Sequence, residues 1–223
     1  MADALADRLA GDLAHALRGG GRAGLIVAGG STPVSVFERL SGHDLDWARV
    51  MVTLTDDRRV PPDHDKSNAR LLRETLLRGP VAAATFLPLS AGEADGATEA
   101  AAANRLLADF PWPAAATLIG MGGDGHIASL FPCAAALAAG LEPGDGQRAI
   151  AICPDPLPAD APFERISLTL SALCDSADVR LMIRGADKRA VLERALATDD
   201  ANSLPVSALL RRAHVPLSIH WSP

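Results

Sequence analysis

Apolar residues follow two different periods along this chain. Leucines recur every four residues from Leu5 to Leu17, which predicts an amphipathic helix over residues 2–18. Three glycines, 19–21, follow and are expected to end it. Short continuous apolar runs instead indicate buried strands. These runs are 25–28, 50–55, 86–89, 116–119, 149–152 and 179–183, and the alternation of apolar and polar residues over 166–170 predicts a further strand.

Helical patterns fill the gaps between several of these strands. Four helices are predicted, one ending near Leu40 and the others over 67–78, 97–108 and 187–197. A last run, 215–219, contains Pro216 and is predicted as an edge strand, because proline cannot donate a hydrogen bond inside a sheet. Alternation of strands and helices predicts an α/β fold with a mostly parallel sheet. No internal repeat or linker interrupts residues 1–223, so a single domain is expected.

Composition narrows the class of protein. Apolar residues make up 48% of the 223 and charged residues 22%, as in ordinary soluble domains. The net charge is −6 with no basic cluster, which argues against a nucleic-acid partner. No apolar run reaches the roughly 18 residues that a membrane span requires. The N-terminus lacks the basic and apolar regions of a signal peptide.

Cysteine usage points to a reducing compartment. Cys133, Cys153 and Cys174 are odd in number, far apart and outside any C-x-x-C pair. This spacing predicts neither a disulfide framework nor a zinc site. A cytoplasmic protein is therefore expected.

The segment Gly120-Met121-Gly122-Gly123-Asp124-Gly125-His126-Ile127-Ala128-Ser129-Leu130-Phe131-Pro132 carries the strongest functional signal. It follows the 116–119 run directly, so its glycines form a tight turn at the end of a strand. Open α/β sheets bind their ligands at such strand ends. The turn holds Asp124 and His126, an acid and an imidazole two residues apart.

The same glycines allow a different interpretation. Gly120, Gly122 and Gly125 fit G-x-G-x-x-G, the fingerprint of dinucleotide binding, which requires a helix immediately after the turn. Pro132 comes only seven residues after Gly125, and the motif lies in mid-chain. No NAD or other cofactor is therefore expected.

His126 suits the role of a general base, because an imidazole titrates near neutral pH. The alternative for Asp124 is a turn residue that only accepts hydrogen bonds from backbone N–H groups. The other five histidines, among them His214, are expected at the surface or in packing.

Two further strand ends carry polar residues. Gly29-Gly30-Ser31-Thr32-Pro33 has the parts of a phosphate cradle, with Thr32 as helix N-cap and Pro33 at the first helical position. A capped helix start without a ligand explains the segment equally well. Asp56-Asp57-Arg58 is predicted as a charged loop on the same edge of the sheet. Its alternative is a solvated loop with weak surface ion pairs.

Three smaller signals remain. Ser67 or Asn68 is expected to cap the 67–78 helix. Arg165 and Lys188 are isolated cations, which are usually exposed. Their spacing cannot show whether they meet at one ligand.

Taken together, these segments resemble the glucosamine-6-phosphate isomerase/6-phosphogluconolactonase family, in family order over about residues 5–210. Phe131 stands where the deaminases of the family carry a glutamate, and Arg58 where they carry an aromatic residue, so the resemblance favours the lactonases. Asp57 departs from the usual Asp-Glu-Arg by one shorter side chain. The matching segments are Gly29-Gly30-Ser31-Thr32-Pro33, Thr55-Asp56-Asp57-Arg58-Arg59-Val60-Pro61 with Ser67-Asn68, Gly120 to Pro132, Arg165-Ile166-Ser167-Leu168-Thr169, Gly185-Ala186-Asp187-Lys188-Arg189-Ala190 and Leu204-Pro205.

The resemblance implies a Rossmann-like three-layer α/β fold with helices on both sides of the sheet. It also implies metal-independent hydrolysis of 6-phospho-D-glucono-1,5-lactone to 6-phosphogluconate in the oxidative pentose phosphate pathway. A sugar-phosphate lactone is thus the expected partner, with no nucleic acid, no membrane and a monomer or weak homodimer. A deaminase or isomerase of amino sugar phosphates and a non-catalytic sugar-phosphate sensor are the alternatives.

The resemblance also assigns roles to residues. His126 would act as the base, Asp124 would orient it or bind sugar hydroxyls, and the glycine turn around Gly123 would stabilise the oxyanion. The phosphate would be held by Gly30, Ser31 and Thr32 together with Arg165 and Lys188. Asp56 and Arg58 would contact the sugar or the phosphate.

Overall fold

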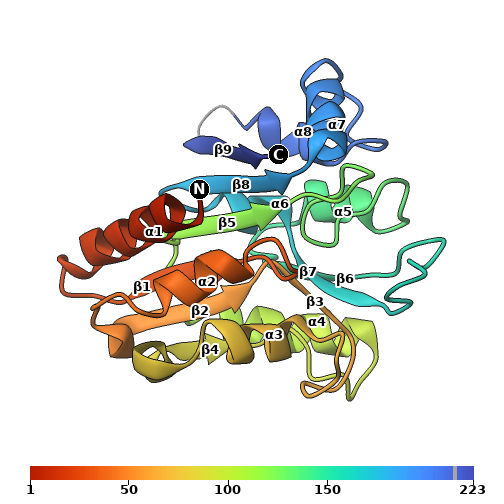
Figure 1. The fold of residues 1–223 in the computed structure, drawn as a ribbon. Coiled ribbons are helices and arrows are strands. Elements are labelled where there is room, and N and C mark those ends of the chain that lie inside the picture. The colour runs from red at the N-terminus through yellow and green to blue at the C-terminus, as the bar shows by residue number, and fades with distance from the viewer. Residues whose placement is uncertain (213–214) are drawn as a thin grey trace.

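Six parallel strands form the central sheet of the computed structural model, which describes residues 1–212 and 215–223 (Figure 1). His214 therefore lies outside the described residues. The strand order is β4-β2-β1-β5-β8-β9. The bounds are β1 Ala23–Val27, β2 Val50–Leu54, β4 Thr85–Leu87, β5 Ala116–Gly120, β8 Val179–Arg184 and β9 Leu217–Ser222.

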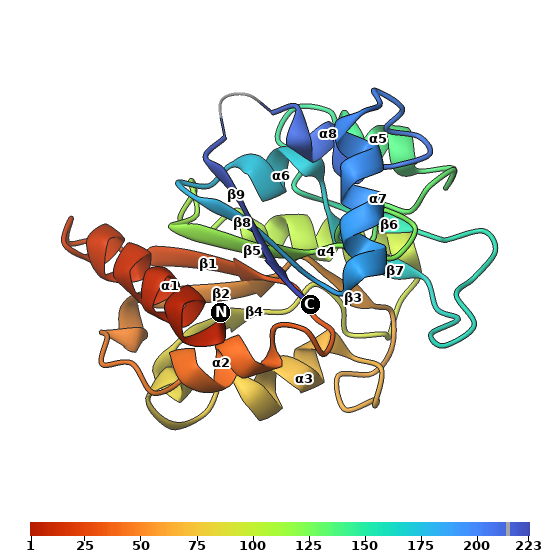
Figure 2. The ribbon, with the colours of Figure 1, turned by 45° about the horizontal axis from the view of Figure 1, so that its top comes forward.

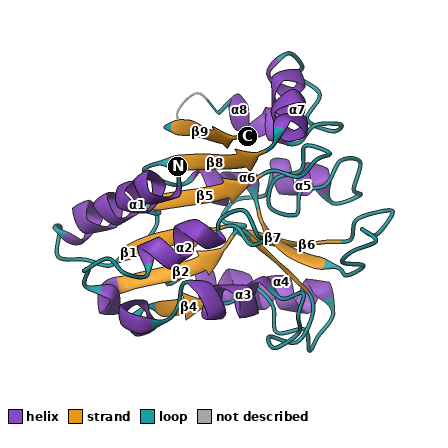
Figure 3. Cartoon of the chain, viewed as in Figure 1, coloured by secondary structure: helices purple, strands orange, loops and turns teal. Residues whose placement is uncertain are grey.

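Burial explains why the strands read as unbroken apolar runs. Every residue of β1 and β2 is buried, because helices cover both faces of the sheet. Figures 1 and 2 show α1, α2 and α3 on one face, with α4 and α6 on the other, and Figure 3 shows the same layers by element type. The helices are α1 Ala2–Leu17, α2 Val34–Leu40, α3 Asn68–Thr75, α4 Gly96–Leu107, α5 Leu137–Leu141, α6 Leu170–Cys174, α7 Ala186–Leu196 and α8 Val206–Leu210, with 3-10 helices at Trp47–Arg49 and Gly79–Ala83.

Most predicted elements are confirmed. The first seven predicted strands agree with the structure to within two residues. The strand predicted over 215–219 is β9 at the edge of the sheet, but it begins at Leu217, so Pro216 precedes it. The leucine stripe of α1 is buried from Leu5 to Leu17. Helices α5, α6 and α8 were missed, because five residues are too few to show a helical period. The predicted strand 166–170 ends at Leu168, and Thr169 caps α6 by accepting from the Ala172 N–H.

A second sheet corrects one prediction. Asp56–Arg58 was expected to be a loop but forms β3, the edge strand of an antiparallel sheet with order β3-β7-β6. The partners are β7 (Arg165–Leu168) and β6 (Ala149–Ile152). The apolar pattern could not indicate this strand, because its residues are charged; its extended backbone is paired with β7.

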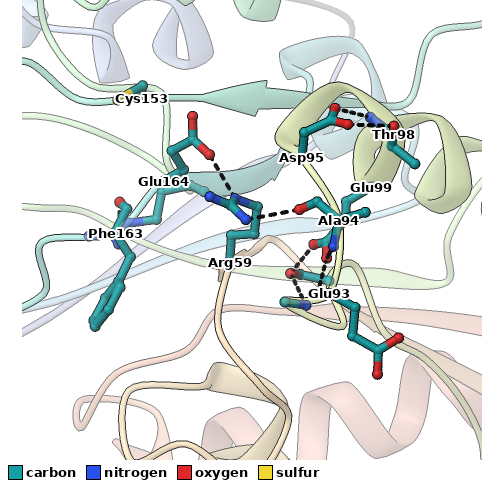
Figure 4. Close-up of polar contacts among 12 residues, drawn as sticks. Arg59, Glu93, Ala94, Asp95, Thr98, Glu99, Cys153, Phe163 and Glu164 are labelled. Carbon is teal, nitrogen blue, oxygen red and sulfur yellow. Dashed lines mark hydrogen bonds and ion pairs between the residues drawn. The ribbon is translucent and has the colours of Figure 1, made fainter.

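Arg59 connects the second sheet to the loop before α4. Its Nε lies 2.7 Å from the Glu164 Oε2, and its Nη1 donates to the carbonyl of Ala94 at 2.8 Å (Figure 4). Glu99, which is buried in α4, accepts from the N–H groups of Glu93 and Ala94 in the same loop. The loop before α4 is thereby tied to both β3 and β7.

When the six parallel strands are numbered by their order in the chain, they lie across the sheet in the order 3-2-1-4-5-6. The direction of the order therefore reverses between β1 and β5. Loops that leave neighbouring strands toward opposite faces open a crevice at such a switch point. The three-layer fold predicted from the sequence is therefore confirmed, and the crevice lies at the end of the strand that carries the glycine turn. The prediction of a single domain stays a prediction. Among the described helices, none is long and apolar enough to cross a membrane.

Candidate functional site

A cavity of about 300 Å³ opens at this switch point, over the carboxyl ends of β1, β2, β5 and β8. We call it the switch-point cavity. Its volume lies at the lower end of the range of small-molecule pockets. The lining residues are Ala28, Gly29, Gly30, Ser31, Thr32, Pro33, Thr55, Asp56, Arg58, Asn68, Leu118, Ile119, Gly120, Met121, Gly122, His126, Ala128, Met182 and Lys188.

Most of the predicted site residues meet here. Seven of them line the cavity, although they come from four separate segments: Gly30, Ser31, Thr32, Asp56, Arg58, His126 and Lys188. The other three predicted residues, Gly123, Asp124 and Arg165, are not part of its lining. Thr55, Asn68, Met121 and Met182 line it without having been predicted as ligand contacts.

The loop after β1 differs from its prediction at the helix start. Helix α2 begins at Val34, so Pro33 rather than Thr32 occupies the N-cap position, and in the described part of the chain no side chain caps this helix. Thr32 as N-cap is therefore wrong. The reason is the turn itself, in which Gly30 has a φ of +84° and the Val34 N–H lies 3.4 Å from the Ser31 carbonyl. Ser31 and Thr32 line the cavity instead.

Asn68 explains why a glycine precedes this loop turn. A Cβ placed on Gly29 would lie 2.1 Å from the Asn68 Oδ1, a distance that no side chain tolerates. The Asn68 Nδ2 also donates to the Asp56 carbonyl at 2.9 Å. Ser67 is the predicted helix cap and accepts from the Arg70 N–H. Sequence reasoning left Asn68 among the candidate caps, because its contact with Gly29 crosses between distant segments.

Asp56 and Asp57 are both buried, so the alternative of a solvated charged loop is wrong. Asp56 lines the cavity and accepts from the Ser129 Oγ at 2.6 Å and from the Thr55 Oγ1 at 2.9 Å. Ser129 belongs to the glycine-turn segment. Its hydrogen bond therefore links the turn after β5 to the strand that follows β2.

Asp57 does not line the cavity and is only 1% exposed. It accepts backbone hydrogen bonds from Asn68 at 2.7 Å, Arg58 at 2.8 Å and Ala69 at 3.0 Å. The pKa of its carboxyl is raised to about 6, mainly by burial and to a smaller extent by the charge of Asp56, while the three N–H groups oppose this rise.

The glycine turn brings His126 to the cavity. The Gly122 N–H donates to the His126 carbonyl at 2.9 Å, which closes the turn. The Asp124 Oδ1 lies 2.6 Å from the His126 Nδ1 and also accepts from the His126 N–H at 3.1 Å. Asp124 therefore both contacts the imidazole and accepts a backbone hydrogen bond within the turn, as the two alternative predictions had it. With Nδ1 engaged by a carboxylate, Nε2 is the ring nitrogen left to act on a ligand.

The surroundings of the pair favour the ionised form of Asp124 and restrain the His126 ring. Burial raises the pKa of Asp124, but its hydrogen bonds with His126 and the charge of that ring outweigh burial and lower the pKa below its usual value. The Phe131 ring lies 4.2 Å from the imidazole, centroid to centroid. Aromatic packing on one side and the carboxylate on the other restrict the imidazole to one orientation.

The three predicted cations lie in different environments. Arg58 lines the cavity and its Nη1 donates to the Lys66 carbonyl at 2.7 Å. Lys188 is half-buried at the cavity wall, and burial lowers the pKa of its ammonium while Asp124 opposes that shift. Arg165 is only 3% exposed, so the expectation of an exposed cation is wrong for this residue.

Arg165 uses its guanidinium on the backbone. Its Nη1 and Nη2 donate to the carbonyls of Phe163 and Ala161, each at 2.9 Å. Burial, followed by the charge of Arg58, lowers its pKa. The structure therefore places Arg165 behind the cavity wall. Among the residues that the structure describes, no group of three or more His, Cys, Asp and Glu is placed to hold a metal ion.

Comparisons with known proteins agree on one family. A family model described as "Glucosamine-6-phosphate isomerases/6-phosphogluconolactonase" matches residues 1–221. The chain is 40% identical to the 6-phosphogluconolactonase of Rhizobium meliloti (strain 1021), over 100% of this chain and 94% of that protein. It is also 40% identical to the 6-phosphogluconolactonase of Pseudomonas aeruginosa, over 100% of this chain and 91% of that protein. The crystal structure of a 6-phosphogluconolactonase from Shewanella baltica superposes with a TM-score of 0.93 at 36% identity, covering 100% of this chain and 93% of that one.

The Gly122→Ala variant tests how tightly the turn holds the imidazole. A Cβ on Gly122 would lie 2.2 Å from two atoms of the His126 ring, so the ring must move away from Asp124. A crystal structure of the variant should show the Asp124–His126 hydrogen bond broken. Gly123→Ala is the matched control, because a Cβ there meets nothing within 4 Å and the hydrogen bond should persist. An unmoved ring in Gly122→Ala contradicts this account.

The buried carboxyl of Asp57 gives the stability of the protein a defined pH dependence. Its folded pKa of about 6 exceeds the ordinary 3.8, so the stability it contributes is complete below pH 4 and is lost as pH rises through 6. We expect the free energy of unfolding of Asp57→Asn, relative to the unmodified protein, to rise by on the order of 3 kcal/mol from pH 4 to pH 7. Urea denaturation at several pH values measures this difference. A difference that does not vary with pH would show that Asp57 titrates normally.

Proposed function

Because the chain belongs to the glucosamine-6-phosphate isomerase/6-phosphogluconolactonase family, we propose that it hydrolyses 6-phospho-D-glucono-1,5-lactone to 6-phosphogluconate in the oxidative pentose phosphate pathway. One observation carries the proposal. The Asp124-oriented His126 and the polar loop Gly29–Pro33 line the same small cavity, together with Lys188. A general base and an anion-binding subsite in one cavity are what a phosphorylated lactone requires.

His126 acts on the water in this proposal. Its Nε2 takes a proton as the water oxygen bonds to the lactone carbonyl carbon, while Asp124 stabilises the imidazolium at Nδ1. The bond between that carbon and the ring oxygen then breaks, and the ring oxygen receives the proton from His126. Asp124 thus orients the imidazole from outside the cavity lining.

The glycine turn supplies donors for the oxyanion. The Gly122 N–H already donates to the His126 carbonyl, and the Gly125 N–H donates to the Gly122 carbonyl. The N–H groups of Gly123 and Asp124 make no backbone hydrogen bond among the described residues, so both are candidate donors, although neither residue is part of the cavity lining. Such fixed donors stabilise charge that develops in the transition state without reorganisation.

The phosphate is assigned to the other side of the cavity. Gly30, Ser31 and Thr32 offer hydroxyl and backbone donors, and Lys188 adds a positive charge. Anchoring the phosphate holds the distant lactone carbon near His126, so that binding energy serves orientation.

Asp56 and Arg58 are assigned to the sugar or the phosphate. A phosphate contact from Arg165 stays a prediction that the family resemblance implies. It requires the guanidinium to release the carbonyls of Ala161 and Phe163. From its buried position, Arg165 contributes positive potential to the cavity without contact.

The proposed reaction uses no metal and no cofactor, because His126, backbone donors and fixed cations supply its proton transfers and charges. We place the enzyme in the cytoplasm, where its three free thiols stay reduced. A monomer or weak homodimer, without a nucleic-acid partner, completes the proposal.

The direct test is hydrolysis of the lactone by the purified protein, with the spontaneous opening rate subtracted and with a chelator present in one arm. We expect enzymatic opening at the same rate with and without chelator. Ammonia release from glucosamine 6-phosphate would instead support a deaminase. Binding of 6-phosphogluconate without turnover would support a sensor.

His126→Ala should lower kcat by about 10²- to 10⁴-fold, the usual contribution of a general base, while substrate affinity stays nearly unchanged. Steady-state kinetics with the background subtracted measure both. His15→Ala is the control, since His15 lies on the exposed side of α1. Wild-type turnover in His126→Ala would refute the assignment of the base.

Lys188→Ala should raise KM by roughly 10- to 100-fold with little change in kcat, because it removes a charged hydrogen bond to the phosphate. Lys188→Arg should restore part of the affinity. Arg189→Ala changes the neighbouring exposed cation of α7, which pairs with Glu193, and should leave KM unchanged. Equal effects at positions 188 and 189 would argue against a specific phosphate contact.

A further inference from the structure

Asp57 is a buried carboxylate outside the switch-point cavity, yet it contacts two residues that line it. We infer that Asp57 is a positioning residue for the proposed reaction: it sets the places of Arg58 and Asn68 by accepting hydrogen bonds from their backbone N–H groups. The inference rests on the proposed function, since it assigns a role within that same site.

The contacts join two separate segments. The Arg58 N–H belongs to β3, whereas those of Asn68 and Ala69 belong to the first turn of α3. All three donate to one carboxylate at 2.7–3.0 Å. Asp57 therefore fixes the end of β3 against the start of α3, although an eight-residue loop, 60–67, and Arg59 separate the two in sequence.

The positions of both segments determine where residues of the cavity lie. The Arg58 guanidinium donates to the Lys66 carbonyl, so the side chain is also tied to the residues just before α3. Asn68 packs against Gly29 so closely that a Cβ has no room there. Displacement of α3 would therefore move Arg58 and the Gly29–Pro33 loop together, and both belong to the subsite assigned to the sugar phosphate.

The need to cap α3 does not by itself explain why a carboxylate is buried at position 57. Ser67 already caps this helix by accepting from the Arg70 N–H. Burial of Asp57 disfavours the ionised form in the folded protein, so the charge is a cost to stability at neutral pH. The Ser67 hydroxyl reaches β3 only through a long 3.4 Å hydrogen bond to the Asp57 Oδ2, so the contact between α3 and β3 depends on the Asp57 carboxylate.

The charged groups that face Asp57 come from both packed strands. They are Asp56 of β3 and Arg165 of β7, while Arg58 contributes its backbone N–H. At pH 8 Asp57 is ionised and accepts all three hydrogen bonds, whereas below pH 6 it is protonated and presents an O–H to N–H donors. The neutral form therefore holds α3 less firmly.

The test compares Asp57→Asn with Ser67→Ala in steady-state lactone hydrolysis at pH 8. Asp57→Asn should raise KM roughly tenfold, with kcat changed by less than about threefold, because a displaced subsite binds less well but leaves His126 in place. Ser67→Ala removes the cap of the same helix and the 3.4 Å hydrogen bond from the Ser67 Oγ to Asp57, but it leaves the three backbone hydrogen bonds of Asp57 in place, so its KM should change by less than about twofold. Equal increases of KM in the two variants would overturn the inference in favour of simple capping.

A pH series adds a readout that a structural role would not move. The ratio of the KM of Asp57→Asn to that of the unmodified enzyme should be largest at pH 8. It should approach one below pH 6, where Asp57 itself becomes neutral. Ionisation of the substrate phosphate cancels in this ratio. A ratio independent of pH, or a loss confined to kcat, would overturn the inference.

Failure of the proposed function is distinguishable from failure of this inference. If the unmodified protein does not hydrolyse the lactone, the proposed reaction is wrong, and the same variants are compared by calorimetric binding of 6-phosphogluconate with the same expected loss. If Asp57→Asn does not fold, Asp57→Ser retains one acceptor oxygen and should show the same rise in KM. Unchanged affinity in the folded variant overturns the inference in either assay.

Discussion

Where the strand order of a parallel sheet reverses, the chain leaves two neighbouring strands toward opposite faces and opens a space between their ends. In this protein that reversal lies between β1 and β5. The Gly29–Pro33 loop follows one strand and the glycine turn with His126 follows the other, so the two face each other across the cavity. The proposed chemistry depends on this arrangement, since neither loop alone combines an anion subsite with a base.

Buried polar contacts hold the two sides of the cavity in fixed positions relative to each other. Asp56 links β3 to Ser129 in the glycine-turn segment, and Asp57 links the same strand to the start of α3. Two adjacent carboxylates on one short strand thus point to different partners, as side chains of successive strand residues do. Because an unpaired buried charge is costly, these contacts hold each carboxylate in one place. The site is therefore organised before any substrate arrives.

The imidazole is held by a different set of contacts. The turn hydrogen bond from Gly122, the Asp124 carboxylate and the Phe131 ring restrain His126 from three directions. In the family resemblance Phe131 occupies the place of a glutamate, and here its ring packs on the imidazole instead of offering a second proton carrier. This agrees with a site in which one base handles the whole reaction.

The sequence by itself determined the strands, the longer helices and the turn that carries His126, because burial and glycine placement leave periodic signals in the chain. It also identified seven of the residues that line the cavity through motifs at strand ends. Only the tertiary structure decided the roles of Asn68, Ser129, Asp57 and Arg165, since their partners lie on segments distant in sequence. The start of α2, the strand at Asp56–Arg58 and the three five-residue helices were also beyond the pattern. Local periodicity records which side chains are buried, but hydrogen bonds between separate segments depend on the packed fold.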